Sequence, residues 1–290
     1  MKIDGVFSGG GMKGLALVGA YEALEKRGIS FVRLAGTSAG SMIAAFIAAG
    51  YTSRELQLMM REVSAEHLLD DTPFDFPLIR WLKIYFTLGL YKGKKLERWL
   101  EEKLALRGLR TFGDLPPEAL RIVTSDITNG RILVLPDDLP SYNINPYTFS
   151  VAKAVRMSCA LPYFFQPVKI PLRHGKALIV DGGMLSNFPL FLFDERKKRK
   201  RPILGVKLST KTTHVPRKVK TGADLLSAMF YTMKDAHDAR YISRRHEKDI
   251  IFIPVTEAST TDFELTDEKK DALIHVGREY TEAFLKRWCY

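Results

Sequence analysis

Short apolar runs, glycine-rich turns and amphipathic stretches follow one another in the first 50 residues. An apolar run at residues 3–7 leads into SGGGMKG, and a stretch with Leu15, Val18 and Leu24 on one face follows. A second apolar run, at residues 31–35, leads into GTSAGS and then into an Ala- and Ile-rich segment typical of a buried helix. Strand, glycine turn and helix repeated in this way indicate a parallel sheet covered by helices on both faces. We therefore predict an α/β fold.

The same reading extends over the rest of the chain. Further strands are predicted at residues 120–124, 131–135, 177–180, 203–208 and 250–254. Amphipathic helices are predicted at residues 94–106, 146–157, 222–244 and 267–288. Because no repeat or low-complexity linker interrupts the chain, we expect one α/β domain, with its main part at residues 1–210 and an extension of helices and strands at residues 211–290 packed on the same domain.

Residues 74–91 depart from this pattern. Their sequence, FDFPLIRWLKIYFTLGLY, is dense in aromatic and aliphatic residues, with Arg80 and Lys83 as its basic positions. A helix of this composition is apolar on most sides and has to pack deeply or meet an apolar partner. A core insertion and a lid or membrane-contact element both fit, since aromatic residues with Arg and Lys suit a bilayer interface.

An excess of basic residues changes the range of partners. The 44 Lys and Arg against 33 Asp and Glu give a net charge of +11, which attracts phosphates of nucleic acids or of anionic lipids and also favours solubility. Part of the excess is the run KKRKR at residues 197–201, which we expect to be a solvated loop. No zinc-type Cys and His spacing, RNA-binding aromatic signature or DNA-reading helix is present, so we expect no nucleic-acid partner.

Targeting signals are also missing from the sequence. No stretch of about 18 apolar residues is free of charge, and the chain opens without the apolar core of a signal peptide. The two cysteines, Cys159 and Cys289, are too few for a disulfide framework, and Cys159 is expected to serve packing. These features predict a cytoplasmic protein, with transient contact to an anionic membrane surface as a hypothesis.

The sequence Gly36-Thr37-Ser38-Ala39-Gly40 places a serine on a predicted turn from strand to helix. Such a turn holds the serine out from the sheet in a strained conformation, and a side chain at either flanking glycine would clash with neighbouring backbone. The helix that follows directs its N-terminal amides toward the reacting centre. Ser38 is therefore a candidate nucleophile; a tight structural turn is the alternative.

A second glycine-rich segment precedes the first helix. It consists of Gly9, Gly10, Gly11, Met12, Lys13 and Gly14. Gly9, Gly11 and Gly14 fit a dinucleotide-binding loop, but the second strand ends without the carboxylate that would hold a ribose. The favoured interpretation is an oxyanion hole formed by backbone amides of residues 9–12, chiefly those of Gly10 and Gly11. Lys13 either adds positive potential near that oxygen or is a surface lysine.

The third motif is Asp181-Gly182-Gly183 after the apolar run 177–180. In a parallel sheet the carboxyl ends of strands open at one edge, so we expect Asp181 to reach Ser38 there. An aspartate before glycines is also common as a turn residue or helix cap.

No histidine has a motif that marks it as the base for a serine. The six are His67, His174, His214, His237, His246 and His275. A carboxylate can accept the proton directly when it contacts the hydroxyl and is partly removed from water.

In this order, segments 9–14, 36–41 and 181–183 resemble the motifs of the patatin-like phospholipase family. The stretches SCALPYFFQP at residues 158–167 and TSDITNG at residues 124–130 resemble further family segments. Lys13 matches a position where the family commonly has Arg or Lys, and Asp-Gly-Gly is a frequent variant of the third motif. The resemblance covers roughly residues 3–210.

The resemblance implies a three-layer α/β/α sandwich with a mainly parallel central sheet. It also implies a Ser38–Asp181 dyad, an oxyanion hole within residues 9–14, and hydrolysis of glycerolipid acyl esters without calcium, metal or other cofactor. We expect a serine lipid acyl hydrolase of the phospholipase A or lysophospholipase type, with a lipid ester as substrate. An acyltransferase using the same serine and a catalytically idle lipid-binding protein are the alternatives.

Overall fold

The computed structural model describes most of the chain. The described residues are 1–62, 68–70, 84–193, 201–209, 219–222, 225, 228–229, 232–233, 247–255 and 265–288. The residues outside them include 74–83 of the aromatic segment, 197–200 of the basic run, the expected domain boundary at 210–211 and most of the helix predicted at 222–244.

Within the described residues, the central sheet has eight strands in the order β10-β9-β1-β2-β4-β8-β7, with β5 also paired to β4. The strands are β1 (Lys2–Phe7), β2 (Ser30–Thr37), β4 (Leu120–Asp126), β5 (Arg131–Leu135), β7 (Val168–Pro171), β8 (Lys176–Asp181), β9 (Ile203–Ser209) and β10 (Ile250–Pro254). The five strands from β10 to β4 are parallel, and β5, β7 and β8 join antiparallel. All seven predicted strands are confirmed, and β7 is an additional one. A separate two-stranded sheet pairs β3 (Gly89–Tyr91) with β6 (Tyr163–Phe165).

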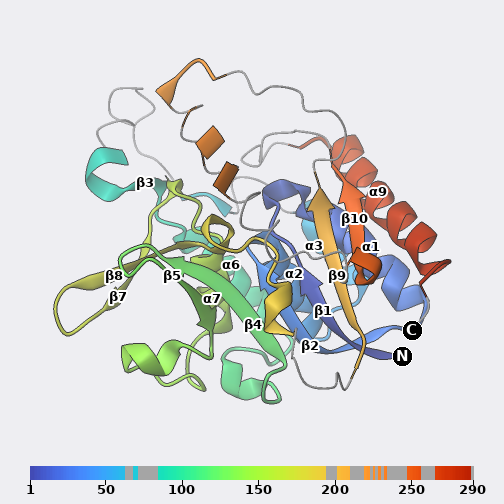
Figure 1. The fold of residues 1–290 in the computed structure, drawn as a ribbon, viewed down its shortest axis with the longest axis horizontal. Helices are drawn as coiled ribbons and strands as arrows, with labels where there is room; N and C mark the ends of the chain where they lie inside the picture. The colour runs from blue at the N-terminus through green and yellow to red at the C-terminus, as the bar shows by residue number, and fades with distance from the viewer. Residues whose placement is uncertain are drawn as a thin grey trace.

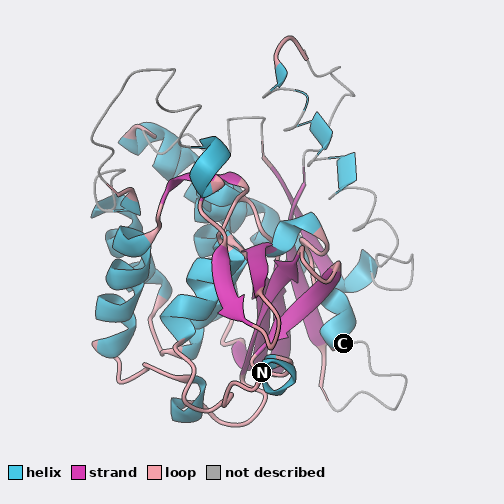
Figure 2. Ribbon diagram, turned by 90° about the vertical axis from the view of Figure 1, so that its left-hand side faces the viewer, coloured by secondary structure: helices cyan, strands magenta, loops and turns pink. Residues whose placement is uncertain are grey.

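Helices cover both faces of the central sheet, which gives the expected three-layer α/β arrangement (Figures 1 and 2). They are α1 (Leu15–Lys26), α2 (Ala39–Ala48), α3 (Ser53–Glu62), α6 (Lys94–Ala105), α7 (Val151–Ser158) and α9 (Asp267–Leu285). Short 3₁₀ turns are η1 (Gly11–Gly14), η2 (Phe112–Asp114), η3 (Leu139–Tyr142), η4 (Gly182–Met184), η5 (Leu190–Leu192) and η6 (Glu247–Asp249). The predicted start of α7 at residue 146 is wrong. The Ser150 hydroxyl accepts a hydrogen bond from the Lys153 amide and caps the helix there.

The C-terminal elements complete the same sheet and the same helical layer. Strand β10 pairs with β9, and α9 crosses α1 at very short range (Figure 1). A Cβ atom at Gly19 would lie 1.9 Å from the carbonyl oxygen of Ile274, and one at Gly277 would lie 1.9 Å from that of Ala16. The two helices therefore approach closely because each carries a glycine at the crossing. No helix of the described residues is long and apolar enough to cross a membrane.

Strand β4 brings two distant strands together along one of its edges. Val123 on β4 pairs with Thr37 at the end of β2, and the next residue, Thr124, pairs with Asp181 at the end of β8. The other edge of β4 is occupied by β5 at both positions. Because β2 is parallel and β8 antiparallel to β4, the carboxyl ends of β2 and β8 meet head to head on one edge.

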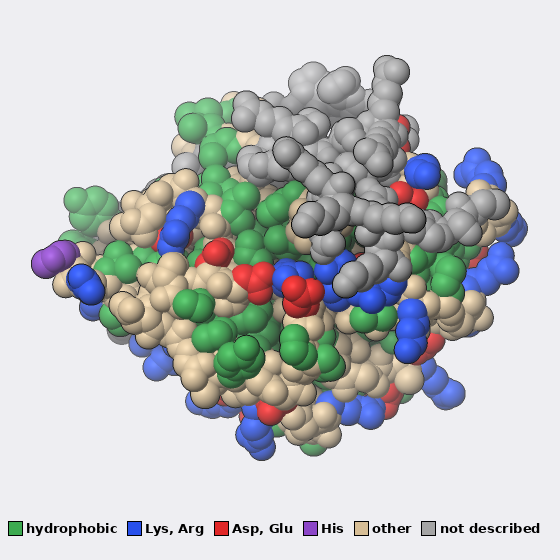
Figure 3. Space-filling view, turned by 60° about the horizontal axis from the view of Figure 1, so that its bottom comes forward, with side chains coloured by type: hydrophobic (Ala, Val, Ile, Leu, Met, Phe, Trp, Pro, Cys, Tyr) green, Lys and Arg blue, Asp and Glu red, His purple; other side chains and the backbone are tan. Residues whose placement is uncertain are grey.

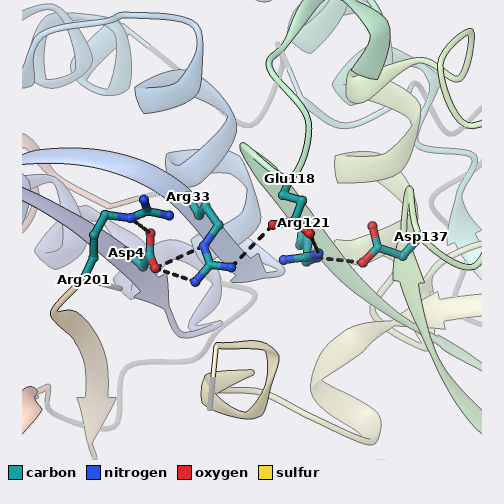
Figure 4. A network of polar contacts seen from close by, with 6 residues as sticks. All are labelled: Asp4, Arg33, Glu118, Arg121, Asp137 and Arg201. Atoms are coloured by element: carbon teal, nitrogen blue, oxygen red, sulfur yellow. Dashed lines mark hydrogen bonds and ion pairs between the residues drawn. The ribbon is translucent and has the colours of Figure 1, made fainter. Parts of the chain in front are cut away.

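A chain of ion pairs lies toward the amino-terminal ends of the parallel strands, away from Thr37 and Asp181 (Figure 4). The Asp4 carboxylate is 1% exposed and contacts Arg33 at 2.6 Å and Arg201 at 3.2 Å. Arg201, the last residue of the basic run, is thus bound to the sheet, contrary to a fully solvated loop. Acidic and basic side chains lie next to one another across the middle of the face in Figure 3.

We predict that Arg33→Met lowers the free energy of unfolding by about 2 to 3 kcal/mol, because it removes one partner of a buried carboxylate and leaves Arg201 in contact. Arg121→Met is the matched control. Its partners Glu118 and Asp137 are 58% and 44% exposed, so the cost is below about 1 kcal/mol. Urea unfolding followed by circular dichroism measures both, and equal effects would contradict the special role of Asp4.

Candidate active site

Ser38 stands on a sharp turn between β2 and α2. Its backbone has φ 51° and ψ −125°, which is strained for a residue with a side chain. A Cβ atom at Gly36 would lie 2.4 Å from the carbonyl oxygen of Gly40, and one at Gly40 would lie 2.3 Å from that of Phe7. The expected reason for the two glycines is confirmed, since a side chain at either would strike backbone.

The backbone of Ser38 is bonded on both sides, and its hydroxyl does not cap α2. Its amide donates to the Ser158 hydroxyl at 2.8 Å, and its carbonyl accepts from the amides of Ser41 at 2.9 Å and Met42 at 3.2 Å. The Ser38 residue is partly exposed. The turn is therefore fixed through its main chain, while the hydroxyl is not used to hold the helix.

Asp181 lies at the end of β8, beside the end of β2, and is 4% exposed. Its Oδ1 accepts from the Gly183 amide at 2.7 Å, so the aspartate also caps η4. A Cβ atom at Gly182 would lie 2.2 Å from the Val123 carbonyl oxygen and 2.9 Å from Cγ2 of Thr37. Gly182 thus packs directly onto the residue before Ser38.

The route by which Asp181 arrives there differs from the expected one. We expected a parallel strand whose carboxyl end opens at the same edge as that of β2. Strand β8 is antiparallel to β4, and its last residue stops level with Thr124, one position beyond the partner of Thr37. The two ends meet because they point toward each other along β4.

Three consecutive residues at the end of α7, residues 158–160, connect the two strand ends. The Ser158 hydroxyl accepts from the Ser38 amide and donates to the Val123 carbonyl at 2.6 Å. Two residues later, the Ala160 carbonyl accepts from the Asp181 amide at 2.9 Å. Ser158 and Ala160 are both fully buried, so these bonds are shielded from water. The resemblance covered this stretch, but the composition gave no sign that Ser158 binds the serine turn.

Cys159 lies between these two contacts. Burial raises the pKa of its thiol to about 12, and the Asp181 carboxylate acts in the same direction. Hydrogen bonding with the side chains of Ser38 and Ser41 opposes this shift in part. The thiol therefore stays protonated near neutral pH. It lies close enough to Ser38 and Asp181 to interact with both.

The glycine-rich segment lies against the serine turn. A Cβ atom at Gly9 would lie 3.2 Å from Cβ of Ser38. The Gly9 amide donates to the Asn187 carbonyl at 3.0 Å, which corrects its expected role as an oxyanion donor. Among the residues that the structure describes, the amides of Gly10, Gly11 and Met12 donate to no backbone carbonyl. These three amides remain the candidate donors.

The rest of this segment packs onto the start of α2. A Cβ atom at Gly14 would lie 2.7 Å from Cβ of Ala39. Lys13 is only 8% exposed, so its interpretation as a surface lysine is wrong.

The two described histidines are exposed and lie on other elements. His174 is in the turn between β7 and β8, at the opposite end of β8 from Asp181. His275 lies on α9, with its ring nitrogen 3.8 Å from the Glu279 carboxylate. His67, His214, His237 and His246 lie outside the described residues. In the described part of the chain, no three His, Cys, Asp or Glu side chains are grouped as a metal site.

The fold and the serine turn define an α/β protein with a serine held at the meeting point of two strand ends. The model of the patatin-like phospholipase family matches residues 5–194, and the chain belongs to this family.

Known proteins similar to this chain range from a full-length relative to distant ones. It is 54% identical to the uncharacterized protein YqhO of Bacillus subtilis over the whole of both chains. It is 28% identical to intracellular phospholipase A2 of Caenorhabditis elegans, over 62% of this chain and 15% of that protein. Among solved structures, VipD from Legionella pneumophila superposes with a TM-score of 0.59 at 20% identity, covering 99% of this chain and 67% of VipD. That likeness shows the shared fold.

We predict that the Cys159 thiol resists alkylation in the native protein. Raising its pKa from 9.0 to about 12 lowers the thiolate fraction at pH 8 by about a thousandfold, and the thiolate is the reactive form. The measurement is iodoacetamide labelling of the peptide that contains Cys159, by mass spectrometry, before and after denaturation in urea. Equal labelling rates in the two states would contradict the protonated thiol.

Proposed function

We propose that this protein is a serine lipid acyl hydrolase of the phospholipase A or lysophospholipase type, with Ser38 as nucleophile and Asp181 as base. The observation that carries the proposal is the meeting of β2 and β8 on one edge of β4, which brings these residues to one place in a member of the patatin-like phospholipase family. The C. elegans relative, named a phospholipase A2, supports a lipid ester as substrate.

The proposed reaction has two steps. The Asp181 carboxylate takes the proton of the Ser38 hydroxyl as Oγ attacks the ester carbonyl, and the carbonyl π electrons move onto its oxygen. Collapse of this intermediate expels the alcohol, which receives the proton from Asp181, and leaves an acyl-serine. Water then attacks the acyl-serine with Asp181 again as base, which releases the fatty acid and restores the hydroxyl.

In each tetrahedral intermediate, the negatively charged oxygen of the former carbonyl group requires hydrogen-bond donors next to Ser38. The amides of Gly10, Gly11 and Met12 are the proposed donors, because this segment packs against Ser38 and the start of α2. The N-terminal end of α2 adds a favourable dipole at the same place. Such donors act without reorganisation, because the glycines hold them against the turn.

Peripheral contact with an anionic membrane is part of the proposal. Long-chain lipid esters are held in bilayers, and the net charge of +11 favours a surface with anionic headgroups. The substrate is therefore reached at the interface.

We predict that Ser38→Ala and Asp181→Asn each lower kcat/KM on a nitrophenyl ester at least about a thousandfold, since each removes a group that acts in the transition state. The matched controls are Ser53→Ala and Asp249→Asn, a buried serine and a buried aspartate on α3 and η6. If a folded Ser38 or Asp181 variant keeps near wild-type turnover, the dyad is wrong. Mass spectrometry of lipid products with and without an added alcohol separates hydrolysis from acyl transfer.

We predict that Ser158→Ala lowers kcat about 10- to 100-fold and changes KM less than about twofold. The variant leaves the Ser38 amide and the Val123 carbonyl without their shared partner, so the serine turn loses its position while the lipid-binding surface is unchanged. Ser53→Ala, which also removes a buried hydroxyl, serves as control for stability alone. An equal fall in kcat for both variants would show that Ser158 has no positioning role.

A further inference from the structure

A group of exposed apolar side chains lies in and just before the two-stranded sheet of β3 and β6. Figure 1 labels β3 in the upper left part of the molecule. Tyr85 is 79% exposed and Phe86 73%, and their rings contact each other at 5.2 Å in the helical turn before β3. Leu88 is 42% exposed, and Tyr163, which pairs with Gly89 across the sheet, is 46% exposed. We call these four residues the apolar ridge. Water contact with so much adjacent apolar surface is unfavourable unless a partner covers it.

Two ridge residues adopt a positive φ angle, which is unfavourable for a residue with a bulky side chain. Leu88 has φ 61° and Tyr163 has φ 65°, and bulky residues rarely adopt this left-handed region. Gly or Asn would fit both positions with less strain. Stability of the fold therefore does not account for large apolar side chains at these two positions.

The ridge is fastened to the candidate active site by Arg156 on α7. Its guanidinium donates to the carbonyls of Lys92 at 2.7 Å, Gly93 at 3.2 Å and Gln166 at 2.9 Å, which follow β3 and β6. The same group lies 4.9 Å from the centre of the Phe165 ring. Arg156 is 2% exposed and stands two residues before Ser158, which holds the Ser38 turn. The ridge is thus fixed relative to Ser38.

Basic residues next to the ridge favour a partner that carries anionic groups. Lys92 and Lys94, directly after β3, are both exposed. Aromatic and aliphatic side chains beside lysines suit the boundary between acyl chains and anionic headgroups. A second copy of this chain would bring the same lysines together, on a protein that already carries +11, so charge opposes self-association through this face.

We propose that the apolar ridge is a docking surface for an anionic lipid bilayer. Tyr85, Phe86, Leu88 and Tyr163 enter the acyl boundary, and Lys92 and Lys94 contact the phosphates of the headgroups. The choice of a bilayer as partner rests on the proposed function, whereas the docking itself requires no turnover. Docking at this point presents the bilayer to the protein at a fixed distance from Ser38.

The test measures sedimentation with vesicles of phosphatidylcholine and phosphatidylglycerol, using full-length protein with Ser38→Ala so that no lipid is cleaved. Tyr85→Ser with Phe86→Ser weakens binding at least about tenfold, because both rings lose their apolar contact. Leu88→Asn with Tyr163→Asn weakens binding as well, while the thermal midpoint stays equal or rises because strain is relieved. Lys92→Glu with Lys94→Glu weakens binding by about fivefold or more per lysine at low salt.

The control pair is Leu106→Ser with Tyr147→Ser, which removes side chains that are 75% and 68% exposed but lie outside the ridge. This pair binds vesicles as the parent does. When the ridge substitutions are made in protein that retains Ser38, the variants keep parental turnover of a soluble nitrophenyl ester, if the proposed activity holds. Parental vesicle binding by both ridge variants, equal loss in the control pair, or loss of a dimer on gel filtration in place of lipid binding would each overturn the proposal. These outcomes do not depend on whether the protein is a hydrolase.

Discussion

The site depends on one constraint, the sharing of a single edge of β4 by two strands that run toward each other. Each β-strand has two edges for hydrogen bonding, and β5 occupies one edge of β4 from Ile122 to Asp126. Strand β2 therefore has to stop at Thr37, opposite Val123, for β8 to end at Asp181, opposite Thr124. A strand longer by one residue on either side would leave no room for the other. The strand lengths thus set the separation of two side chains about 140 residues apart in sequence.

Once the two strand ends meet, the space around them is filled by backbone. A Cβ atom at Gly36, Gly40 or Gly182 would lie within 2.5 Å of a carbonyl oxygen, so any side chain there would force the strands apart. Ser38 is the exception, and it has a strained backbone. Its strain persists because its neighbours hold the conformation from several sides, with Ser158 on its amide and α2 on its carbonyl. The close packing of backbone around the strand ends and the strained conformation of Ser38 therefore both follow from the meeting of β2 and β8.

The sequence predicted seven strands of the central sheet and most helices, because each of these carries its own apolar pattern. The serine turn was also predictable, since its glycines and the change from strand to helix are local. The direction of β8 was not, because the short run 177–180 contains no signal for the neighbour it joins, and β7 and its hairpin went unnoticed. The Gly9 amide is bound by the Asn187 carbonyl and the Ser158 hydroxyl by the Ser38 amide, partners 178 and 120 residues away, which no local pattern contains.

Arg156 is a buried cation near this site that makes the local structure rigid at a cost in stability. Burial lowers the pKa of its guanidinium, and its Nη1 has no hydrogen-bond partner among the described residues. A buried cation that bonds carbonyl groups in place of a carboxylate is destabilising compared with an apolar side chain of the same volume. In return, one planar group joins the ends of β3 and β6 to the helix that ends at Ser158. Under the proposed function, a surface that presents a lipid ester to Ser38 requires a stiff connection of this kind, because a displacement of about 1 Å at the reacting atoms costs about a hundredfold in rate. The orphaned nitrogen is therefore better understood as part of the link between surface and site than as a flaw in the core.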